Sequence, residues 1–358
     1  MILTRRATIA GAMAFTGFGG CSRRNEPVVV GPVPPLKSVT GIPVGCCVET
    51  DNLRDRAFTD LLLRDFNQIT PSYEMKMSIC VRPDGSFNFG PADRLIAFAA
   101  DKGMRLHGSA LVWYKYQPAA FQALGGQRDA FERLYADWIG QMVGRTRGVA
   151  SGWDVINEPI EHDEIRLRDS LWTKVLGPEE HMVMALDLAT KADPGAIHFI
   201  NEYDLERRPE KRLLFMKLIE SLLKKGAKIG GIGTQTHIEL ADRGTIKPAI
   251  ADLASFGLPI HISELDVSLG RWRANRASPA VKLSDQAAVA AETADAFVAL
   301  PSSQRYALTL WGLRDRDSWL QMPPFDAERG DLPLAFDDAG KPKPMAAALA
   351  KSLAAAPL

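Results

Sequence analysis

Two glutamates, Glu158 and Glu264, each follow an apolar segment that is typical of a buried strand. The surrounding motifs read WDVINEP at 153–159 and HISELDVS at 261–268. A carboxylate at the end of a buried strand costs free energy unless it has partners or a task. Retaining glycoside hydrolysis requires two carboxylates, one as general acid and then base and the other as nucleophile. One such glutamate alone is as readily a solvated loop residue, so the hypothesis of catalysis rests on the pair.

Length and composition limit the classes of protein to consider. The chain has 358 residues, 46% of them hydrophobic, which fills the core of one large α/β barrel or of two modest domains. Lys+Arg and Asp+Glu balance at 43 each, so the formal net charge is zero. No basic stripe indicates a nucleic-acid partner, and no long apolar run after the N-terminus indicates a membrane span. A neutral polysaccharide is compatible with this charge.

The N-terminal residues have the features of an export signal. A short basic start, MILTRR, precedes an apolar stretch of small residues, and Cys21 follows two glycines as at a lipoprotein processing site. The Arg-Arg pair resembles a twin-arginine signal, although a chance pair behind a misassigned start codon would look the same. We predict an export signal over 1–20, a Pro-rich tether over 21–36 and Cys21 as a lipidation candidate. The expected location is the periplasm, the outer membrane as a lipoprotein, or the medium.

Three further cysteines, Cys46, Cys47 and Cys80, do not form a scaffold of disulfides. In an exported protein, Cys80 could pair with one of the two adjacent cysteines. The alternative is that all three are small buried thiols. No CxxC or Cys/His spacing is typical of a metal site, so we expect neither a metal nor another cofactor.

Apolar strand-like segments alternate with helical segments along the rest of the chain. Eight repeats in this order predict a parallel sheet with right-handed crossovers, which closes into a single (β/α)8 TIM barrel over 37–358. A last helix is expected around 343–355. In such a barrel, chemistry gathers at the C-terminal ends of the strands. The expected strands cover 41–48, the end of 60–70, 104–113, 152–157, 196–201, 228–237, 258–264 and 305–312.

An ordered set of motifs resembles the family ten glycoside hydrolases, which are mainly endo-1,4-β-xylanases. The resemblance extends from about residue 41 to residue 345. Asn-Glu-Pro alone occurs in many barrel glycosidases, whereas the ordered set is specific to this family. The motifs are WDVINEP, FINEYD (199–204), GIGTQTH (231–237), ISELDV (262–267), LWGLRDRDSW (310–319) and PLAFDDAGKPKP (333–344).

The resemblance assigns the chemistry to the two glutamates. It makes Glu158 the acid/base, which holds a proton when the glycosidic oxygen arrives, and Glu264 the nucleophile. It further implies that Asn157 bonds the 2-hydroxyl of the reacting sugar, a bond that assists catalysis if it strengthens in the transition state. Outside this context, an Asn at a strand end is often a turn or cap residue.

The resemblance also implies supports for the two glutamates. His237 is expected to bond Glu264 and to be oriented in turn by Asp266, which would fix the rotamer and charge of the nucleophile. Gln235, two residues before His237, is expected to position Glu158. A lone His near a strand end is more often structural, so this interpretation depends on its neighbours.

Four residues match sugar-binding positions of the family. Trp311 and Trp319 correspond to an aromatic lid, because the apolar face of a sugar stacks on an indole ring. Trp113 corresponds to another cleft position, and Lys76 to a lysine that bonds sugar hydroxyls. The alternatives are core packing for each tryptophan and a solvated loop position for the lysine.

Departures from the family concentrate around the sugars that stay with the nucleophile. Ser72 and Tyr73 stand where the family usually has Glu-Asn, and Met77 replaces a Trp. Ser109 and Tyr114 stand where histidines are usual. The sequence also departs at Tyr116 or Gln117, at Glu202 and at Asp204. We therefore expect the sugar-holding part of the site to be rebuilt around unchanged catalytic groups.

The sequence thus predicts an exported retaining endo-1,4-β-xylanase that acts on xylan or xylo-oligosaccharides as a monomer. An alternative within the same class is a divergent member that acts on short, substituted or aryl β-glycosides. An alternative of another class is a non-catalytic carbohydrate-binding protein on a xylanase scaffold, which has no need of both glutamates. A membrane is expected as a partner only through the lipid anchor, and endo against exo action stays open.

Overall fold

The computed structural model describes residues 31–270, 275–322 and 331–356. The predicted export signal, the lipidation candidate Cys21 and most of the predicted tether lie outside these ranges. A 3-10 helix at Leu36–Ser38 opens the ordered fold, with Leu36 buried and its amide donating to Asp65 Oδ1 at 3.2 Å. The end of the predicted tether is therefore packed against the barrel.

Within the described residues, nine parallel strands form one sheet in the order β6-β5-β4-β3-β2-β1-β9-β8-β7. Strand β6 also pairs with β8, which closes eight strands into a barrel and leaves the short β7 attached beside β8. The predicted TIM barrel is confirmed. The strands are β1 Val44–Val48, β2 Gln68–Pro71, β3 Arg105–Trp113, β4 Ala150–Asn157, β5 Ile197–Glu202, β6 Gly231–Thr234, β7 His237–Glu239, β8 Ile260–Ser268 and β9 Arg305–Leu310.

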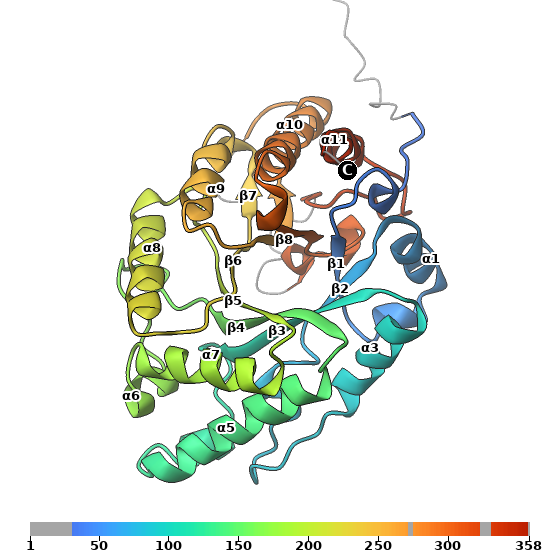
Figure 1. Cartoon of the computed structure of the whole chain (residues 1–358). Coiled ribbons are helices and arrows are strands. Elements are labelled where there is room, and N and C mark those ends of the chain that lie inside the picture. The colour runs from blue at the N-terminus through green and yellow to red at the C-terminus, as the bar shows by residue number, and fades with distance from the viewer. Residues whose placement is uncertain (1–30, 271–274, 323–330, 357–358) are drawn as a thin grey trace, which may run out of the picture.

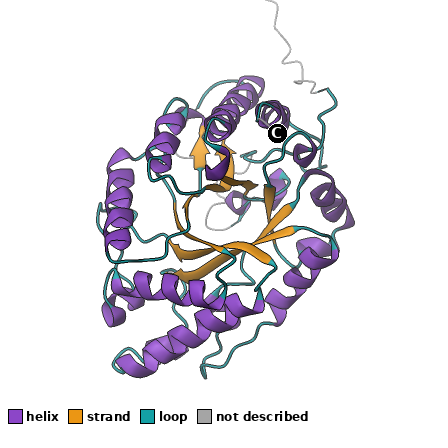
Figure 2. Cartoon of the chain, viewed as in Figure 1, coloured by secondary structure: helices purple, strands orange, loops and turns teal. Residues whose placement is uncertain are grey.

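Helices surround the barrel, and α11 closes the ring beside α10 (Figure 1). Figure 2 shows the strands inside this ring of helices. None of the helices in the described ranges is both long and apolar enough to cross a membrane. They are α1 Arg56–Asp65, α2 Met77–Cys80, α3 Gly90–Asp101, α4 Ala119–Ala123, α5 Arg128–Arg145, α6 Leu171–Leu176, α7 Glu180–Ala192, α8 Pro209–Lys224, α9 Ile246–Ala254, α10 Pro279–Val298 and α11 Pro344–Ala354.

A cluster of rings fills the barrel interior. His107 on β3, Phe199 on β5, His261 on β8 and Tyr306 on β9 contact one another with ring centroids 4.4–5.8 Å apart. Because these strands lie around the barrel, their side chains can meet only inside it. His107 is held by Tyr306 Oη and by an Asp154 oxygen, each at 3.0 Å. This layer of polar and aromatic side chains fills the barrel interior and forms the floor below its mouth.

Two of the differences from the predicted strand ranges bear on the site. The segment predicted as one strand over 228–237 is two strands, because Thr236 adopts a left-handed backbone with φ of 59° and turns the chain between them. Strand β8 was expected to end at Glu264 but continues to Ser268, since its last residues pair with β7 and place His237 beside Asp266. Glu264 therefore lies inside a strand rather than at its end.

The disulfide considered for Cys80 is absent from the described residues. Cys46, Cys47 and Cys80 are free and buried. The Cys80 thiol donates to the carbonyl oxygen of Glu74 at 3.2 Å. The interpretation as small buried thiols is the correct one, and the fold is held by its core rather than by cross-links.

The close approach of β3 and β4 gives a stability prediction. A Cβ at Gly108 would lie 2.2 Å from ring carbons of the buried Trp153, so Gly108→Ala should overpack the core and lower the free energy of unfolding by about 1–3 kcal/mol. Gly140, within α5, has no atom within 4 Å of an added Cβ, apart from its chain neighbours and its own helix, so Gly140→Ala should raise that free energy by about 0.5–1 kcal/mol. Urea unfolding of both variants measures the contrast. Equal stabilities would contradict it.

Candidate active site

A cleft of about 530 Å³ opens at the C-terminal ends of the strands, the position at which barrel enzymes carry their chemistry. Both glutamates singled out from the sequence line it. Its wall contains all the predicted site residues of the barrel except Asp266, which is fully buried behind His237. The predicted lining residues are Lys76, Trp113, Asn157, Glu158, Gln235, His237, Glu264, Trp311 and Trp319.

Glu158 follows β4 in a left-handed backbone conformation, with φ of 55°. Such a conformation is unfavourable for a residue with a side chain and persists only where its surroundings hold it. Here the Glu158 amide donates to the Asn201 carbonyl at 2.9 Å, and Arg168 Nε donates to the Glu158 carbonyl at 2.9 Å. Gln235 Nε2 and Asn157 Nδ2 donate to the carboxylate at 3.0 and 3.2 Å. The backbone turn and two amides therefore fix the direction of this carboxylate.

Glu264 is buried on β8, with 6% of its surface exposed. Asn201 Nδ2 donates to its Oε1 at 2.9 Å, and His237 Nε2 lies 3.3 Å from its Oε2. Burial raises the pKa of Glu264, while the bond from His237 and the nearby Lys76 charge oppose this rise. Each oxygen of this carboxylate is thus held by a different donor.

His237 connects Glu264 to a second buried carboxylate. Its Nδ1 lies 2.8 Å from Asp266 Oδ2, and Trp319 Nε1 donates to the same oxygen at 2.8 Å. Burial alone would lower the pKa of His237, but the Asp266 and Glu264 carboxylates outweigh it and raise that pKa to about 10. The imidazole is therefore a cation at neutral pH and donates from both nitrogens.

Asn201 is a member of the site that the sequence did not single out. Its Nδ2 donates to Asn157 Oδ1 at 3.0 Å as well as to Glu264, so one amide joins the surroundings of both glutamates. Ser263 Oγ donates to Asn201 Oδ1 at 2.8 Å and fixes the orientation of the amide. The sequence did contain a sign of this role, because Ile-Asn-Glu occurs both at 156–158, where β4 ends, and at 200–202, where β5 ends, and the register pairs Asn157 with Asn201.

One end of the cleft has aromatic walls and a buried cation. Lys76 Nζ lies 4.5 Å from the Trp113 ring centroid and 5.2 Å from that of Tyr73. Trp311 and Trp319 lie beside the imidazole of His237, with centroids 6.4 and 5.1 Å from it. Burial lowers the pKa of Lys76, and the Glu264 carboxylate opposes this shift.

The other end of the cleft is lined by His162, Tyr203 and Arg207, which the sequence did not single out, and by Asp204, one of the departures from the family pattern. His162 and Tyr203 stack with ring centroids 5.7 Å apart, and Arg207 and Asp204 lie next to them in the wall. They come from the segments after β4 and β5, so Glu158 separates them from Lys76 and Trp113. Flat rings and polar groups at this end can hold a sugar on the far side of Glu158.

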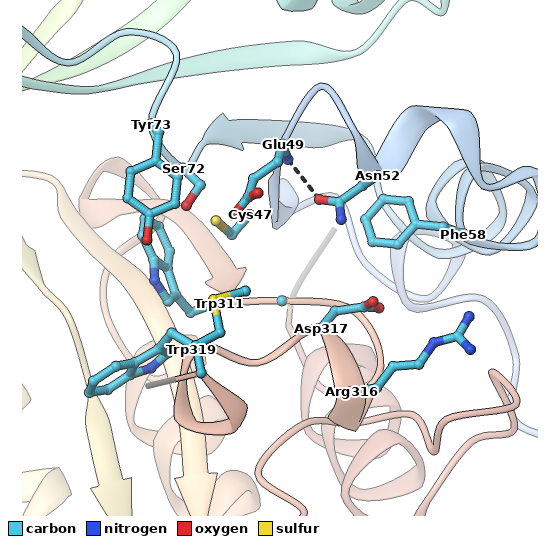
Figure 3. Close-up of a pocket in the computed structure, with 12 residues that line it drawn as sticks. Cys47, Glu49, Asn52, Phe58, Ser72, Tyr73, Trp311, Arg316, Asp317 and Trp319 are labelled. Carbon is cyan, nitrogen blue, oxygen red and sulfur yellow. Dashed lines mark hydrogen bonds between the residues drawn. The ribbon is translucent and has the colours of Figure 1, made fainter. Parts of the chain in front are cut away.

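Most of the positions that depart from the family pattern face the cleft, whereas Met77 and Glu202 are buried outside its lining. Ser72, Tyr73, Ser109 and Tyr114 all line it. Ser72 and Tyr73 additionally line a side cavity of about 170 Å³ that adjoins the cleft at the end formed by β1 and β2 (Figure 3). These four positions therefore belong to the wall of the cleft.

One group in the described residues has the composition of a metal site. His107, Asp154 and His261 each offer a ligand atom, and these atoms lie within 4.8 Å of one another. They lie in the barrel interior below the cleft, where His107 already bonds Asp154 at 3.0 Å and His261 Nε2 lies 2.8 Å from Thr309 Oγ1. These hydrogen bonds explain the group as part of the packed barrel interior rather than as a metal site.

Comparisons with known proteins identify the family. The family model for "Glycosyl hydrolase family 10" matches residues 36–352. Endo-1,4-beta-xylanase B of Paenibacillus barcinonensis is 30% identical over 310 residues, covering 84% of this chain and 92% of that protein. Endo-1,4-beta-xylanase A of Caldicellulosiruptor saccharolyticus is 32% identical over 312 residues, covering 84% and 90%.

Solved structures agree with these matches. Native xylanase 10B from Thermotoga maritima superimposes with a TM-score of 0.79 at 28% identity, covering 89% of this chain and 98% of that one. The family 10 structure from Paenibacillus barcinonensis gives 0.81 at 30% identity, covering 89% and 97%. The family predicted from the ordered motifs is confirmed, and the chain belongs to glycosyl hydrolase family 10.

Proposed function

We propose that this protein is a retaining endo-1,4-β-xylanase that hydrolyses β-1,4-xylosidic bonds in xylan or xylo-oligosaccharides by double displacement. The observation that carries the proposal is that two carboxylates, Glu158 and Glu264, line one cleft. Each accepts hydrogen bonds from its own donors, and Asn201 links the two sets. The xylanase relatives named above supply the substrate class. Retention of both carboxylates with their supports argues against a role limited to sugar binding.

Glu264 is the proposed nucleophile. Its carboxylate attacks the anomeric carbon while Glu158 gives its proton to the departing glycosidic oxygen, which yields a glycosyl-enzyme and a free leaving sugar. Glu158 then removes a proton from the water that attacks this intermediate, and the product keeps its configuration. The His237 cation keeps Glu264 charged and oriented for the first step.

The two ends of the cleft then take different parts of the substrate. The proton donor must face the leaving oxygen, so the leaving sugars lie on the side of Glu158 that carries His162 and Tyr203. The sugars that stay on Glu264 lie toward Lys76 and Trp113. Asn157 accepts a bond from Asn201 at its Oδ1, which leaves its Nδ2 beside Glu158 as the group that can reach the 2-hydroxyl of the reacting sugar.

A second candidate of the same class is supported by the rebuilt end of the cleft. Ser72, Tyr73, Ser109 and Tyr114 remove two acidic or amide side chains and two imidazoles that the family pattern would bring to the retained sugars. Each lost neutral hydrogen bond weakens binding by about 0.5–1.5 kcal/mol. Tyrosine rings supply stacking surface instead. This favours relatively better use of short, substituted or aryl β-glycosides than of an undecorated chain.

The proposed catalytic roles predict different behaviour for the two alanine variants. Glu264→Ala should abolish cleavage of every substrate, since no glycosyl-enzyme forms. Glu158→Ala should lose xylan cleavage but retain much more activity on aryl glycosides, whose leaving groups need little protonation. Added azide should restore turnover of Glu158→Ala and give a β-glycosyl azide.

Two observations would contradict these roles. Equal loss of both substrate types in Glu158→Ala, without azide rescue, would remove Glu158 from the acid/base position. Proton NMR of the wild-type reaction should show the β-anomer as the first product, and an α-anomer would exclude double displacement.

The charge on His237 leads to a prediction about pH dependence. The raised pKa of His237 means that the cation is present below about pH 10 and is lost as the pH rises through that value. His237→Gln removes the cation, so the pKa of Glu264 should rise and the acidic limb of kcat/KM should move to higher pH. Loss of a charge-assisted bond of about 1.5–3 kcal/mol should lower kcat/KM at neutral pH roughly 10- to 150-fold.

A histidine outside the cleft provides the control. Burial lowers the pKa of His198 to about 4, so this imidazole is neutral at the pH of the assay. His198→Gln should leave the acidic limb in place. An unchanged limb in His237→Gln would show that the imidazole does not set the charge state of Glu264.

We also propose export and a lipid anchor at Cys21, on the basis of the N-terminal sequence. The wild type should then fractionate with membranes, whereas Cys21→Ala should be released or left unprocessed. A wild-type protein found wholly in the cytoplasm would overturn this proposal. The catalytic unit is proposed to act as a monomer, which sedimentation of the processed protein tests.

A further inference from the structure

The side cavity beside the cleft is continuous with the proposed substrate site. Both are lined by Ser72, Tyr73, Trp311 and Trp319. The cavity lies at the end that holds the retained sugars, away from His162 and Tyr203. A substrate that extends past the reacting sugar on this side therefore meets the cavity next (Figure 3).

A carboxylate that the catalytic mechanism does not use lies in the wall of this cavity. Glu49 follows directly after β1, and the register pairs Val48 with Pro71, so Glu49 stands beside Ser72 on the neighbouring strand. The Ser72 amide donates to the Val48 carbonyl at 3.0 Å, and both Ser72 and Glu49 line the cavity. Figure 3 shows Glu49, Ser72 and Cys47 gathered on one wall, while Trp311 and Trp319 come from the segment after β9.

The carboxylates of Glu49 and Glu74 have different surroundings. The Glu74 carboxylate accepts bonds from the backbone amides of Thr50 and Tyr73 and so serves the loops around it. Glu49 is half-buried, and this burial followed by repulsion from Glu74 raises its pKa, while the nearby Ser72 hydroxyl opposes the rise. A carboxylate with incomplete hydration gains free energy from hydroxyl donors that a ligand brings.

The place of Glu49 also matches the main departure of this chain from its family. The family pattern has a glutamate at position 72, where this chain has the short, uncharged Ser72. Glu49 brings a carboxylate to the place beside Ser72 from the end of the adjacent strand. Position 72 thus has no acid of its own, while a carboxylate stands at the neighbouring strand end in the wall of the side cavity.

We propose that Glu49 is a specificity-determining residue that binds hydroxyl groups of the second retained sugar, the one linked to the reacting sugar on the side away from the leaving group. This inference rests on the proposed function. The flat wall of Trp311 and the ring of Tyr73 enclose the same space and offer stacking surface for that sugar. The substrate class is therefore a chain with at least two neutral sugars on the retained side.

Glu49→Gln tests the proposal with two aryl substrates. p-Nitrophenyl β-xylobioside places a second sugar at Glu49, whereas p-nitrophenyl β-xyloside does not. Loss of a charge-assisted bond should lower kcat/KM on the xylobioside roughly 10- to 100-fold, mainly through KM, and change the xyloside less than about 2-fold. Asp60→Asn, an exposed acid on α1 paired with Arg56, is the control and should leave both values unchanged.

A charge exchange provides the second variant. Glu49→Ser combined with Ser72→Glu moves the acid to the position usual in the family and should recover most of the xylobioside activity. Equal losses on both substrates in Glu49→Gln, with an unchanged thermal melt, would overturn the inference and leave the proposed function intact. A wild type that cleaves neither aryl glycoside nor xylan would overturn the proposed function and this inference with it.

Discussion

The site depends on one constraint, which is that two carboxylates must be held close together where little water reaches them. Each therefore needs its own donors, because like charges in a partly buried cleft repel and burial disfavours ionisation. Glu158 receives the amides of Gln235 and Asn157, and Glu264 receives His237 and Asn201. Asn201 also donates to Asn157 Oδ1 and thereby links the two sets of donors.

The barrel makes this arrangement possible by ending its strands at a common edge. The turn at Glu158 uses a left-handed backbone, and so does Thr236 between β6 and β7. Conformations of this kind cost on the order of 1–3 kcal/mol each and need compensating bonds. The Glu158 amide donates to the Asn201 carbonyl, and Thr236 Oγ1 donates to Glu206 at 2.8 Å. The left-handed residues thus lie at the rim beside the proposed catalytic groups, and local hydrogen bonds compensate for their backbone conformation.

The alternation of apolar and helical segments was sufficient to predict the barrel, because each strand is buried on both faces and leaves a continuous apolar run. Boundaries that depend on backbone conformation were not predictable in this way. The split at Thr236 and the extension of β8 past Glu264 arise from pairing between β7 and β8, which no local pattern encodes. Asn201 was overlooked because a strand-end amide has many ordinary uses, and its role follows from a register that only the folded sheet defines.

The same reasoning explains why the departures at Ser72 and Tyr73 look like losses in the sequence. A comparison along the chain judges each position by itself, whereas a parallel barrel sets neighbouring strand ends side by side. A carboxylate that is missing at one strand end can be supplied by the next, as the place of Glu49 beside Ser72 in the side cavity indicates. What a sugar meets is the chemistry at a place on the rim. The ends of β1 and β2 form one such place, because Glu49 and Ser72 stand side by side there and line the same cavity.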